Sequence, residues 1–365
     1  MSPLSVVLAG GGSAGHVNPL LATADALRRR VPDATISVLG TAEGLEARLV
    51  PERGYELTTV PKVPFPRRPG MAAVRFPSSL QRAVGTALAV LRDKEADVVV
   101  GFGGYVATPA YLAARRAGVP IVIHEQNARA GLANRLGARF TSAVATTFAM
   151  TALPNARLVG LPLRAEIRDL DRGSARAEGL AHFGLDEGRP TLLVFGGSLG
   201  AQRINEAVAG AAADLLAAGV QVLHLTGAGK DVEVPEADAT TGARYVALPY
   251  TDRMELAYAV ADLALGRSGA GTVSELAALG LPAVYVPLPI GNGEQRLNAA
   301  EVVEAGGGIL VDDAELDPDR VRSTVLPLVT DPDRLAAMGA AAAGHGERHA
   351  DDALVDLVLA TAGVR

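Results

Sequence analysis

The chain has 365 residues, of which 49% are hydrophobic and only 4% aromatic, and it contains no cysteine or tryptophan. This length suits two globular domains, and small apolar side chains in this proportion are typical of a soluble α/β protein rather than a disordered one. A formal net charge of -6 argues against nucleic acid as a partner, because phosphate-backbone binding requires a basic face. The lack of cysteine excludes disulfides, thiolate chemistry and cysteine-based zinc sites.

The N-terminus enters an apolar strand pattern directly, without the basic start, long apolar region and cleavage site of a signal peptide. No stretch reaches the roughly 18 apolar residues that a spanning helix needs, and the closest is Ala83 to Leu91. We therefore expect a cytoplasmic protein whose contact with a membrane lies at its surface.

Short apolar runs that end near glycine alternate with Ala/Leu-rich amphipathic stretches, which predicts repeated βα units and parallel sheets. In the first half the predicted strands are Ser5–Ala9, Thr35–Leu39, Asp97–Val100, Pro120–His124 and Ala143–Thr147. In the second half they are Thr191–Phe195, Gln221–Leu225, Arg244–Ala247, Leu263–Leu265 and Ala283–Val286.

The strand pattern pauses near Leu158–Arg164 and restarts at Thr191, which indicates two domains, residues 1–162 and 163–344. Both halves open with a strand, a glycine turn and a helix, so we predict a duplicated Rossmann-like architecture. Residues 345–365 form a separate tail, in which apolar residues between Asp351 and Thr361 recur at helical spacing. The periodicity does not show which domain this tail covers.

Gly10-Gly-Gly-Ser-Ala-Gly15 follows the first strand and satisfies the G-x-G-x-x-G pattern of dinucleotide-binding folds. A dehydrogenase would also place an acidic residue at the end of the second strand, whereas here Glu43 is displaced into the following loop. The first loop therefore fits a dinucleotide site imperfectly.

Three more glycine turns follow predicted strands, at Gly101–Tyr105, Gly196–Gly200 and Arg267–Gly271. Glycine allows close approach of the backbone to a ligand, and a helix N-terminus offers free N–H groups to an anion. Glycine loops in both halves indicate a ligand held between them. The alternative is that each glycine only relieves strain in its own turn.

His16 directly follows the first glycine loop, at the carboxyl edge where open α/β sheets bind ligands. A near-neutral imidazole there is well placed to take a proton from an attacking hydroxyl, although a lone histidine can equally be a capping residue.

Glu275 lies about one turn inside the helix that follows Arg267-Ser-Gly-Ala-Gly271, where a carboxylate can accept hydrogen bonds from a ribose diol. The alternative is a glutamate favoured by the helix dipole. Further along, Glu294 and Gln295 occupy a polar loop and can meet sugar hydroxyls, or form only a turn.

Taken in order, these motifs closely resemble the MurG family of peptidoglycan glycosyltransferases, and the resemblance spans nearly the whole chain. The matching motifs are Gly11–His16 with Asn18-Pro19, Gly101–Tyr105, His124-Glu-Gln-Asn127, Gly160–Arg164, Gly196–Ala201, Arg267–Glu275, and Gly293-Glu-Gln295 with Asn298-Ala299. In the family, the first motif typically reads Gly-Gly-Thr-Gly-Gly-His and the last motif Gln-Gln. Ser13, Ala14 and Glu294 depart from this pattern.

The resemblance implies a glycosyltransferase-B fold, in which two Rossmann-like domains face each other across a cleft and the final helix returns to the first domain. It implies that His16 is the catalytic base, that Glu275 binds the ribose and that Gln295 binds the sugar hydroxyls. The implied donor-contacting residues are Ser13, Ala14, Gly15, Asn127, Arg164, Ser198, Thr251, Ala270, Gly271, Thr272, Val273, Ser274, Glu275 and Gln295. The implied acceptor side comprises Gly103, Gly104, Tyr105 and Glu125.

The activity implied is inverting transfer of N-acetylglucosamine from UDP-GlcNAc to the 4-hydroxyl of the N-acetylmuramyl unit of undecaprenyl-linked lipid I, giving lipid II. No cofactor or metal is expected, because no Asp-x-Asp motif is placed to hold a cation on the diphosphate. We interpret the pairs Asp312-Asp313 and Asp351-Asp352 as surface or helix-start charges.

The segment Lys62 to Arg82 mixes cations with Phe65, Met71, Val74 and Phe76. Such a surface suits anionic lipid, and a lipid-linked substrate favours this interpretation over a merely basic loop. We therefore expect peripheral binding to the cytoplasmic face of the cell membrane.

Two other functions fit the same loops. One is another nucleotide-sugar enzyme of this fold, such as an epimerase or a different lipid glycosyltransferase. The other is a non-catalytic subunit that binds the donor, against which the position of His16 argues.

Overall fold

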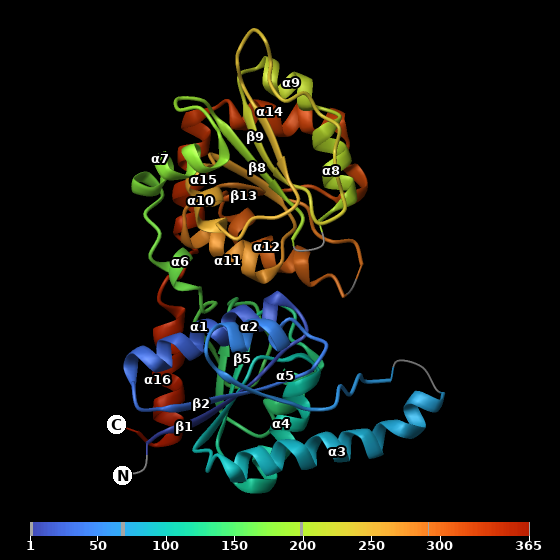
Figure 1. Cartoon of the computed structure of the whole chain (residues 1–365), viewed down its shortest axis with the longest axis vertical. Helices are drawn as coiled ribbons and strands as arrows, with labels where there is room; N and C mark the ends of the chain where they lie inside the picture. Colours follow the sequence, from blue (N-terminus) through green and yellow to red (C-terminus); the bar gives the residue numbers. More distant parts are fainter. Residues whose placement is uncertain (1–2, 67–69, 198–199, 291, 365) are drawn as a thin grey trace. The chain divides into compact units, whose positions relative to one another are not determined.

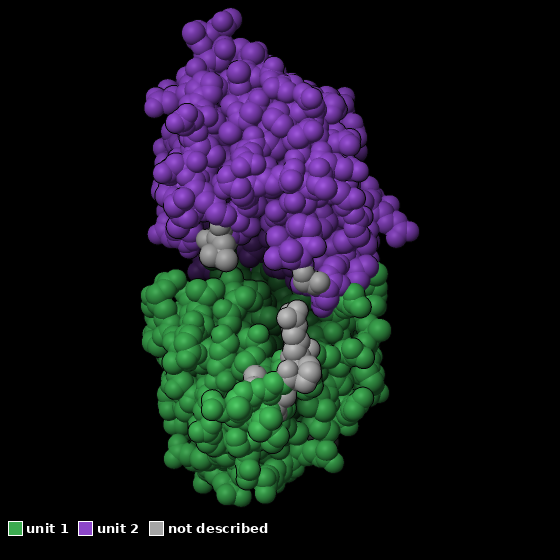
Figure 2. All heavy atoms as spheres, turned by 90° about the vertical axis from the view of Figure 1, so that its right-hand side faces the viewer, with its two compact units in different colours: residues 1–164, 348–365 green, residues 165–347 purple. Residues whose placement is uncertain are grey.

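The structure is a computed structural model that describes residues 3–66, 70–197, 200–290 and 292–364. The chain divides into two compact units, which Figure 2 colours separately. Unit 1 comprises residues 1–164 and 348–365, and unit 2 comprises residues 165–347.

Unit 1 is built on a seven-stranded parallel sheet with the order β3-β2-β1-β4-β5-β6-β7. Its strands are β1 (Ser5–Ala9), β2 (Thr35–Gly40), β3 (Glu56–Thr59), β4 (Val98–Gly101), β5 (Ile121–Glu125), β6 (Ala143–Thr146) and β7 (Ala156–Leu158). Its helices are α1 (Ala14–Arg30), α2 (Glu46–Glu52), α3 (Met71–Asp93), α4 (Gly104–Ala117), α5 (Leu132–Gly137) and α16 (Ala350–Ala362).

Helices cover both faces of this sheet. The side chains of a strand alternate between the two faces, and here both sets are apolar. Val6 and Leu8 of β1 pack with α1 and α16, whereas Val7 and Ala9 pack with α3 and α4. The α4 helix ends at Gly118, whose left-handed φ of 73° is a conformation that glycine adopts without strain. Figure 1 shows α3 continuing well beyond the strands.

The tail helix α16 lies beside α1 in unit 1 (Figure 1). Leu354, Val355 and Val358 are buried in the core that α1 shares with the strands. An ion pair supports this packing, since Arg29 of α1 contacts the buried carboxylate of Asp351 at 2.8 Å. The Asp351 side chain is therefore a buried helix-start charge rather than a surface one.

Unit 2 is built on a six-stranded parallel sheet with the order β10-β9-β8-β11-β12-β13. Its strands are β8 (Thr191–Phe195), β9 (Gln221–Leu225), β10 (Tyr245–Leu248), β11 (Leu263–Gly266), β12 (Ala283–Tyr285) and β13 (Gly308–Leu310). Its α-helices are α6 (Ala165–Arg168), α7 (Arg172–Phe183), α8 (Gln202–Ala209), α9 (Ala212–Ala217), α10 (Met254–Val260), α11 (Ala270–Ala278), α12 (Glu294–Glu304), α13 (Pro318–Arg320), α14 (Leu326–Val329) and α15 (Pro332–Ala343). A 3₁₀ turn, Asp313–Glu315, and a π-helical turn, Val321–Val325, complete the unit.

Each sheet reverses its strand order at one point, between β1 and β4 in unit 1 and between β8 and β11 in unit 2. The loops that leave two such strands at their carboxyl ends diverge and create the place where open α/β sheets bind ligands. The predicted glycine loops follow these four strands. Within the described ranges, no helix is long and apolar enough to cross a membrane.

Candidate functional site

His16 lies in the first turn of α1, directly after the glycine loop that leaves β1. Its Nδ1 atom is 3.0 Å from the hydroxyl oxygen of Ser13, which is the N-cap residue of the same helix. When Nδ1 carries the proton and donates it to Ser13, the lone pair of Nε2 is available to accept a proton from a substrate.

The loop that leaves β4 covers the other side of the His16 ring. A Cβ atom at Gly103 would lie 3.2 Å from Cδ2 and 3.3 Å from Nε2 of His16. Gly103 has φ 85° and ψ -161°, a conformation that is essentially restricted to glycine. The neighbouring Gly104 packs equally closely, since its Cβ would lie 2.8 Å from the carbonyl oxygen of Gly11. The glycines thus allow the two loops to meet beside the imidazole.

Burial lowers the pKa of His16 below the ordinary value of a histidine, and the negative charge of Glu46 partly opposes this shift. Neutral imidazole therefore predominates near pH 7, which is the form that a general base requires.

The carboxylate of Glu46 lies fully buried beneath the first glycine loop. It accepts hydrogen bonds from the backbone N–H of Gly12 at 2.8 Å, the backbone N–H of Thr41 at 2.8 Å and the Thr41 hydroxyl at 2.7 Å. Burial alone would raise the pKa of Glu46, but these hydrogen bonds outweigh it and hold the pKa below its usual value.

Glu125, predicted on the acceptor side, is 2% exposed. Its carboxylate accepts hydrogen bonds from Asn127 N, Gly131 N and Asn134 Nδ2 at 2.9 to 3.0 Å. Burial raises its pKa, and the hydrogen bonds partly offset that effect. This geometry favours a role in shaping the loop after β5 over direct contact with a substrate.

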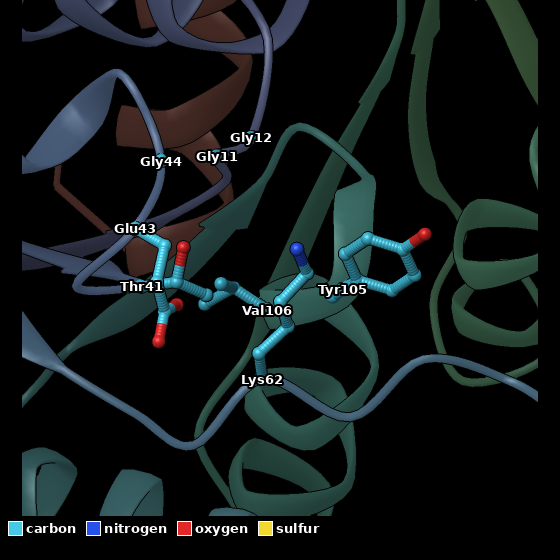
Figure 3. Close-up of a pocket in the computed structure, with 8 residues that line it drawn as sticks. All are labelled: Gly11, Gly12, Thr41, Glu43, Gly44, Lys62, Tyr105 and Val106. Atoms are coloured by element: carbon cyan, nitrogen blue, oxygen red, sulfur yellow. The ribbon is translucent and has the colours of Figure 1, made fainter.

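A small open pocket lies next to the first glycine loop (Figure 3). Its lining residues are Gly11, Gly12, Thr41, Glu43, Gly44, Lys62, Tyr105 and Val106. The Lys62 ammonium points into this pocket and lies 5.4 Å from the centre of the Tyr105 ring, within the range of a cation–π contact. Tyr105 is 44% exposed, so it offers an open aromatic surface to a ligand.

The other predicted ligand residues of unit 1 are accessible to differing degrees. Ser13 and Gly15 are exposed, whereas Ala14, Asn127 and Arg164 are half-buried. Asn127 lies in the loop that Glu125 stabilises, because its N–H donates to that carboxylate.

In unit 2, two of the predicted donor segments follow β8 and β11 at the reversal point of the second sheet. Thr251 lies in the loop after β10, and Glu294 and Gln295 form the first turn of α12 rather than the polar loop that the sequence predicted. The segment Ala270 to Glu275 forms the first turns of α11 after β11. Ser198, predicted in the loop after β8, lies outside the described residues. A Cβ at Gly200 would lie 2.1 Å from the Thr226 carbonyl oxygen, so this loop can pack so closely only with glycine there.

Glu275 is half-buried, and its Oε2 atom accepts a hydrogen bond of 2.7 Å from the hydroxyl of Tyr258 in α10. Tyr258 is itself 1% exposed and packs edge-on against Phe195 at the end of β8. A residue in the core of unit 2 therefore fixes the side-chain conformation of Glu275, the residue predicted to bind the ribose.

The side chains of Gln295 and Thr251 each accept a hydrogen bond from a nearby backbone N–H group. The side-chain oxygen of Gln295 accepts a 3.0 Å hydrogen bond from Leu288 N, which leaves its amide nitrogen as a donor for a ligand. The Thr251 hydroxyl accepts a 3.0 Å bond from Arg253 N. Arg267, which precedes α11, forms a 2.6 Å ion pair with Asp313 and supports the base of this loop.

No group of three or more acidic or histidine side chains that could hold a metal ion occurs in the part of the chain that the structure describes. The acidic pairs noted in the sequence are engaged in ion pairs: Asp312 with Arg296, Asp313 with Arg267 and Arg203, and Asp351 and Asp352 with Arg29.

Sequence patterns did not predict the roles of Glu46 and Tyr258. Glu46 resembles an ordinary acidic residue in the first turn of a helix, and Tyr258 an ordinary core residue of an amphipathic helix. Only the structure shows that Glu46 is surrounded by glycines at 11, 40 and 44, where an added Cβ atom would collide with its side chain.

Family comparisons match both units. Residues 6–146 match the glycosyltransferase family 28 N-terminal domain, and residues 191–354 match the glycosyltransferase family 28 C-terminal domain. The chain is 57% identical over 356 residues to the UDP-N-acetylglucosamine--N-acetylmuramyl-(pentapeptide) pyrophosphoryl-undecaprenol N-acetylglucosamine transferase of Nocardioides sp., with 98% of each chain covered. It is 58% identical over 365 residues to the transferase of that name from Acidothermus cellulolyticus, with 99% of each chain covered.

The chain belongs to the MurG family of glycosyltransferases. A MurG-family crystal structure, that of Acinetobacter baumannii MurG, is similar to this chain with a TM-score of 0.80 and 29% identity, covering 98% of this chain and 100% of that one. The fold expected from the sequence, glycosyltransferase-B with two parallel-sheet domains, is confirmed.

The crystal structure of a UDP-GlcNAc 2-epimerase from Neisseria meningitidis, with UDP-GlcNAc bound, is also similar to this chain. The TM-score is 0.69, and the match covers 98% of this chain and 100% of that one. Its identity of 14% to this chain shows the common fold alone, so an epimerase activity is not favoured.

Proposed function

We propose that this protein transfers N-acetylglucosamine from UDP-GlcNAc to the 4-hydroxyl of the N-acetylmuramyl unit of undecaprenyl-linked lipid I, which produces lipid II for peptidoglycan synthesis. The observation that carries the proposal is the identity of 57–58% to transferases of this name over nearly the full length of both chains. The site geometry supports an enzyme that activates a hydroxyl nucleophile.

We assign the role of general base to His16. The acceptor oxygen attacks the anomeric carbon of the sugar as the bond from that carbon to the UDP oxygen breaks. The electron pair leaves with UDP, and the acceptor proton passes to Nε2 of His16. Attack opposite the leaving group inverts the anomeric configuration from α to β. Ser13 supports this role because its hydroxyl oxygen can hold the Nδ1–H tautomer.

We assign the nucleotide side of the donor to the loops of unit 2. Glu275, oriented by Tyr258, accepts hydrogen bonds from the ribose, and the amide of Gln295 donates to a sugar hydroxyl. The first turn of α11, from Ala270, offers backbone N–H groups to the charge that develops on the diphosphate. Ser13, Ala14, Gly15, Asn127 and Arg164 of unit 1, with Ser198 and Thr251, complete the proposed donor contacts.

We assign the acceptor to unit 1, at the pocket beside the first glycine loop. Tyr105 and Lys62 present an aromatic face and a cation there, which suit a sugar ring and an anionic group of a lipid-linked saccharide. Gly103 and Gly104 shape the wall next to His16. The proposal requires neither a cofactor nor a metal ion.

We place the protein at the cytoplasmic face of the cell membrane, bound peripherally through the segment that includes the start of α3. Phe65, Met71 and Val74 are 64 to 74% exposed, and Arg75 and Arg82 are exposed nearby. Apolar side chains among cations suit an anionic lipid surface. Arg67 and Arg68 belong to the predicted segment but lie outside the described residues.

The test is release of UDP from UDP-GlcNAc by the purified protein, with and without a lipid I analogue and in the presence of a chelator. We expect release that depends on the acceptor and is insensitive to the chelator. Release without acceptor, together with a sugar epimer, would instead indicate an epimerase. Donor binding without release in any condition would indicate a non-catalytic subunit.

A further inference from the structure

The buried carboxylate of Glu46 connects two loops that are distant in sequence. Its Oε2 atom accepts from Gly12 N in the loop after β1, and its Oε1 atom accepts twice from Thr41 in the loop after β2. Both oxygens are therefore occupied by donors of the protein itself. An uncompensated carboxylate would not remain buried, so these bonds are what keep its charge in place.

The space that Glu46 fills exists because three surrounding residues are glycines. A Cβ atom would lie 2.2 Å from its carboxylate at Gly11, 2.0 Å at Gly44 and 2.5 Å from its Cγ atom at Gly40. Any larger residue at these positions would displace the side chain. The cavity is thus shaped for one carboxylate directly beneath the first glycine loop.

The path from this carboxylate to His16 is short. Gly12, which donates to Glu46, is adjacent to Ser13, whose hydroxyl contacts Nδ1 of His16. Movement of Gly12 would therefore move the group that sets the tautomer of the imidazole. The carboxylate also places a negative charge near the ring, where proton transfer creates a positive one.

We propose that Glu46 is a positioning residue for His16. It fixes the glycine loop that presents Ser13 to Nδ1, and its buried charge stabilises the imidazolium that forms when His16 accepts the acceptor proton. This inference rests on the proposed function for its catalytic consequence, whereas its effect on His16 is independent of that function.

Two uncharged side chains and a glycine also lie around His16. Ser13 faces the ring from the start of α1, and Gly103 faces it from the turn after β4. Asn134 of α5 lies near the same glycine. Neither the Ser13 hydroxyl nor the Asn134 amide is charged, whereas the Glu46 carboxylate acts on His16 through its charge and is therefore the group that the experiment changes.

The experiment compares Glu46→Gln with wild type in two readouts, the His16 titration followed by NMR of histidine-labelled protein and the pH profile of sugar transfer. His16→Ala identifies the His16 signal. The amide keeps the size of the side chain but loses its charge and one acceptor. We expect the His16 midpoint and the acidic limb of the rate to move to lower pH, and the maximal rate to fall about 10- to 100-fold.

Two variants separate positioning from general damage. Gly44→Ala retains the charge of Glu46, but its added methyl group would displace the Glu46 carboxylate, so it should lower the rate as well. Asp25→Asn removes another partly buried carboxylate of unit 1, which accepts from Arg53 and Tyr55, and should leave the His16 midpoint unchanged.

An unchanged His16 midpoint in folded Glu46→Gln, with a rate within twofold of wild type, would overturn the inference. If Glu46→Gln does not fold, a wild-type rate in Gly44→Ala would overturn it. Absence of transfer by the wild type would count against the proposed function instead, and the NMR titration would still decide the role of Glu46.

Discussion

The phenol of Tyr258 donates a 2.7 Å hydrogen bond to Glu275 from within the core of unit 2. Tyr258 lies in α10 and Glu275 in α11, so the bond joins the helices on either side of β11. A carboxylate held in this way is oriented before a ligand arrives, which reduces the entropy lost on binding.

Tyr258→Phe should therefore weaken UDP binding without unfolding the protein. The ring and its contact with Phe195 remain, but the bond that orients Glu275 is lost. We expect the Kd for UDP to rise about tenfold, or about 1.4 kcal/mol, measured by calorimetry.

The matched control is Tyr245→Phe, which removes a buried phenol of the same unit that contacts His224 at 2.7 Å rather than Glu275. It should reduce stability while leaving the UDP affinity unchanged. Equal affinities for UDP in wild type and Tyr258→Phe would contradict the assigned role.

His16→Ala should lower the rate of transfer roughly 10²–10⁴-fold with little change in UDP affinity, because it removes a proton acceptor rather than a nucleotide ligand. In wild type, burial lowers the pKa of His16, so the active neutral form should persist at neutral pH. Activity should fall only as the pH drops through this lowered value. Steady-state rates from pH 5 to 8 test both statements, and full turnover in His16→Ala would exclude the base assignment.

Gly103→Ala should slow transfer at least tenfold, because the new methyl group would contact the His16 ring near Nε2 and the residue would be strained at φ 85°. Gly118→Ala provides the control, since Gly118 also has a positive φ of 73° but no atom within 4 Å of its added Cβ. It should destabilise the fold by about 1 kcal/mol and retain the rate. A comparison of initial rates at saturating substrate distinguishes the two variants.

The buried strands were predictable from the sequence because their apolar runs are continuous. All ten predicted strands occur, and Ser5–Ala9, Thr191–Phe195 and Gln221–Leu225 have the predicted bounds. The edge strands β3, β7 and β13 were not predicted. They have only three or four residues and few fully buried side chains, so they lack a clear apolar run.

The site was predictable where one segment carries the chemistry, as with His16 after its glycine loop or Glu275 after the loop of β11. It was not predictable where partners come from distant segments. The role of Glu46 depends on glycines from three separate positions, and that of Tyr258 on a hydrogen bond from α10 to α11. Periodicity assigns such residues to a helix but does not reveal what their polar atoms contact.

Acid should destabilise the fold through two buried histidines, His124 in unit 1 and His224 in unit 2. Burial lowers the pKa of each to about 4. In His124, Nδ1 faces the amide nitrogen of Gln126, which is a donor, so the neutral ring fits and a second proton does not. In His224, Nδ1 contacts the Tyr245 hydroxyl, and burial disfavours the charged ring.

The folded-state pKa of these histidines lies below the unfolded value of about 6.5. At pH values between the two, the unfolded chain therefore binds more protons than the folded chain. Stability should therefore decline from pH 6.5 towards pH 4, by up to about 1.4 kcal/mol per pH unit for each histidine. Urea unfolding at several pH values measures this slope, which should be shallower in His224→Gln. A free energy independent of pH in this range would contradict the prediction.

Arg75→Glu with Arg82→Glu should weaken binding to anionic vesicles, since each cation near such a surface contributes about 1 kcal/mol. Arg92→Glu is the control, because Arg92 is exposed on α3 at the opposite end of the helix. Co-sedimentation with vesicles of phosphatidylglycerol and phosphatidylcholine gives the bound fractions. If the double variant binds as wild type does, this segment is not the membrane contact.

The most direct test of the proposed activity is analysis of the product formed from UDP-GlcNAc and a lipid I analogue by the purified protein. Mass spectrometry and NMR of the product should show one added N-acetylhexosamine, β-linked to the 4-hydroxyl of the N-acetylmuramyl unit, with one UDP released for each. An unmodified acceptor under conditions in which UDP-GlcNAc binds, or an α-linked product, would contradict the inverting transfer proposed for His16.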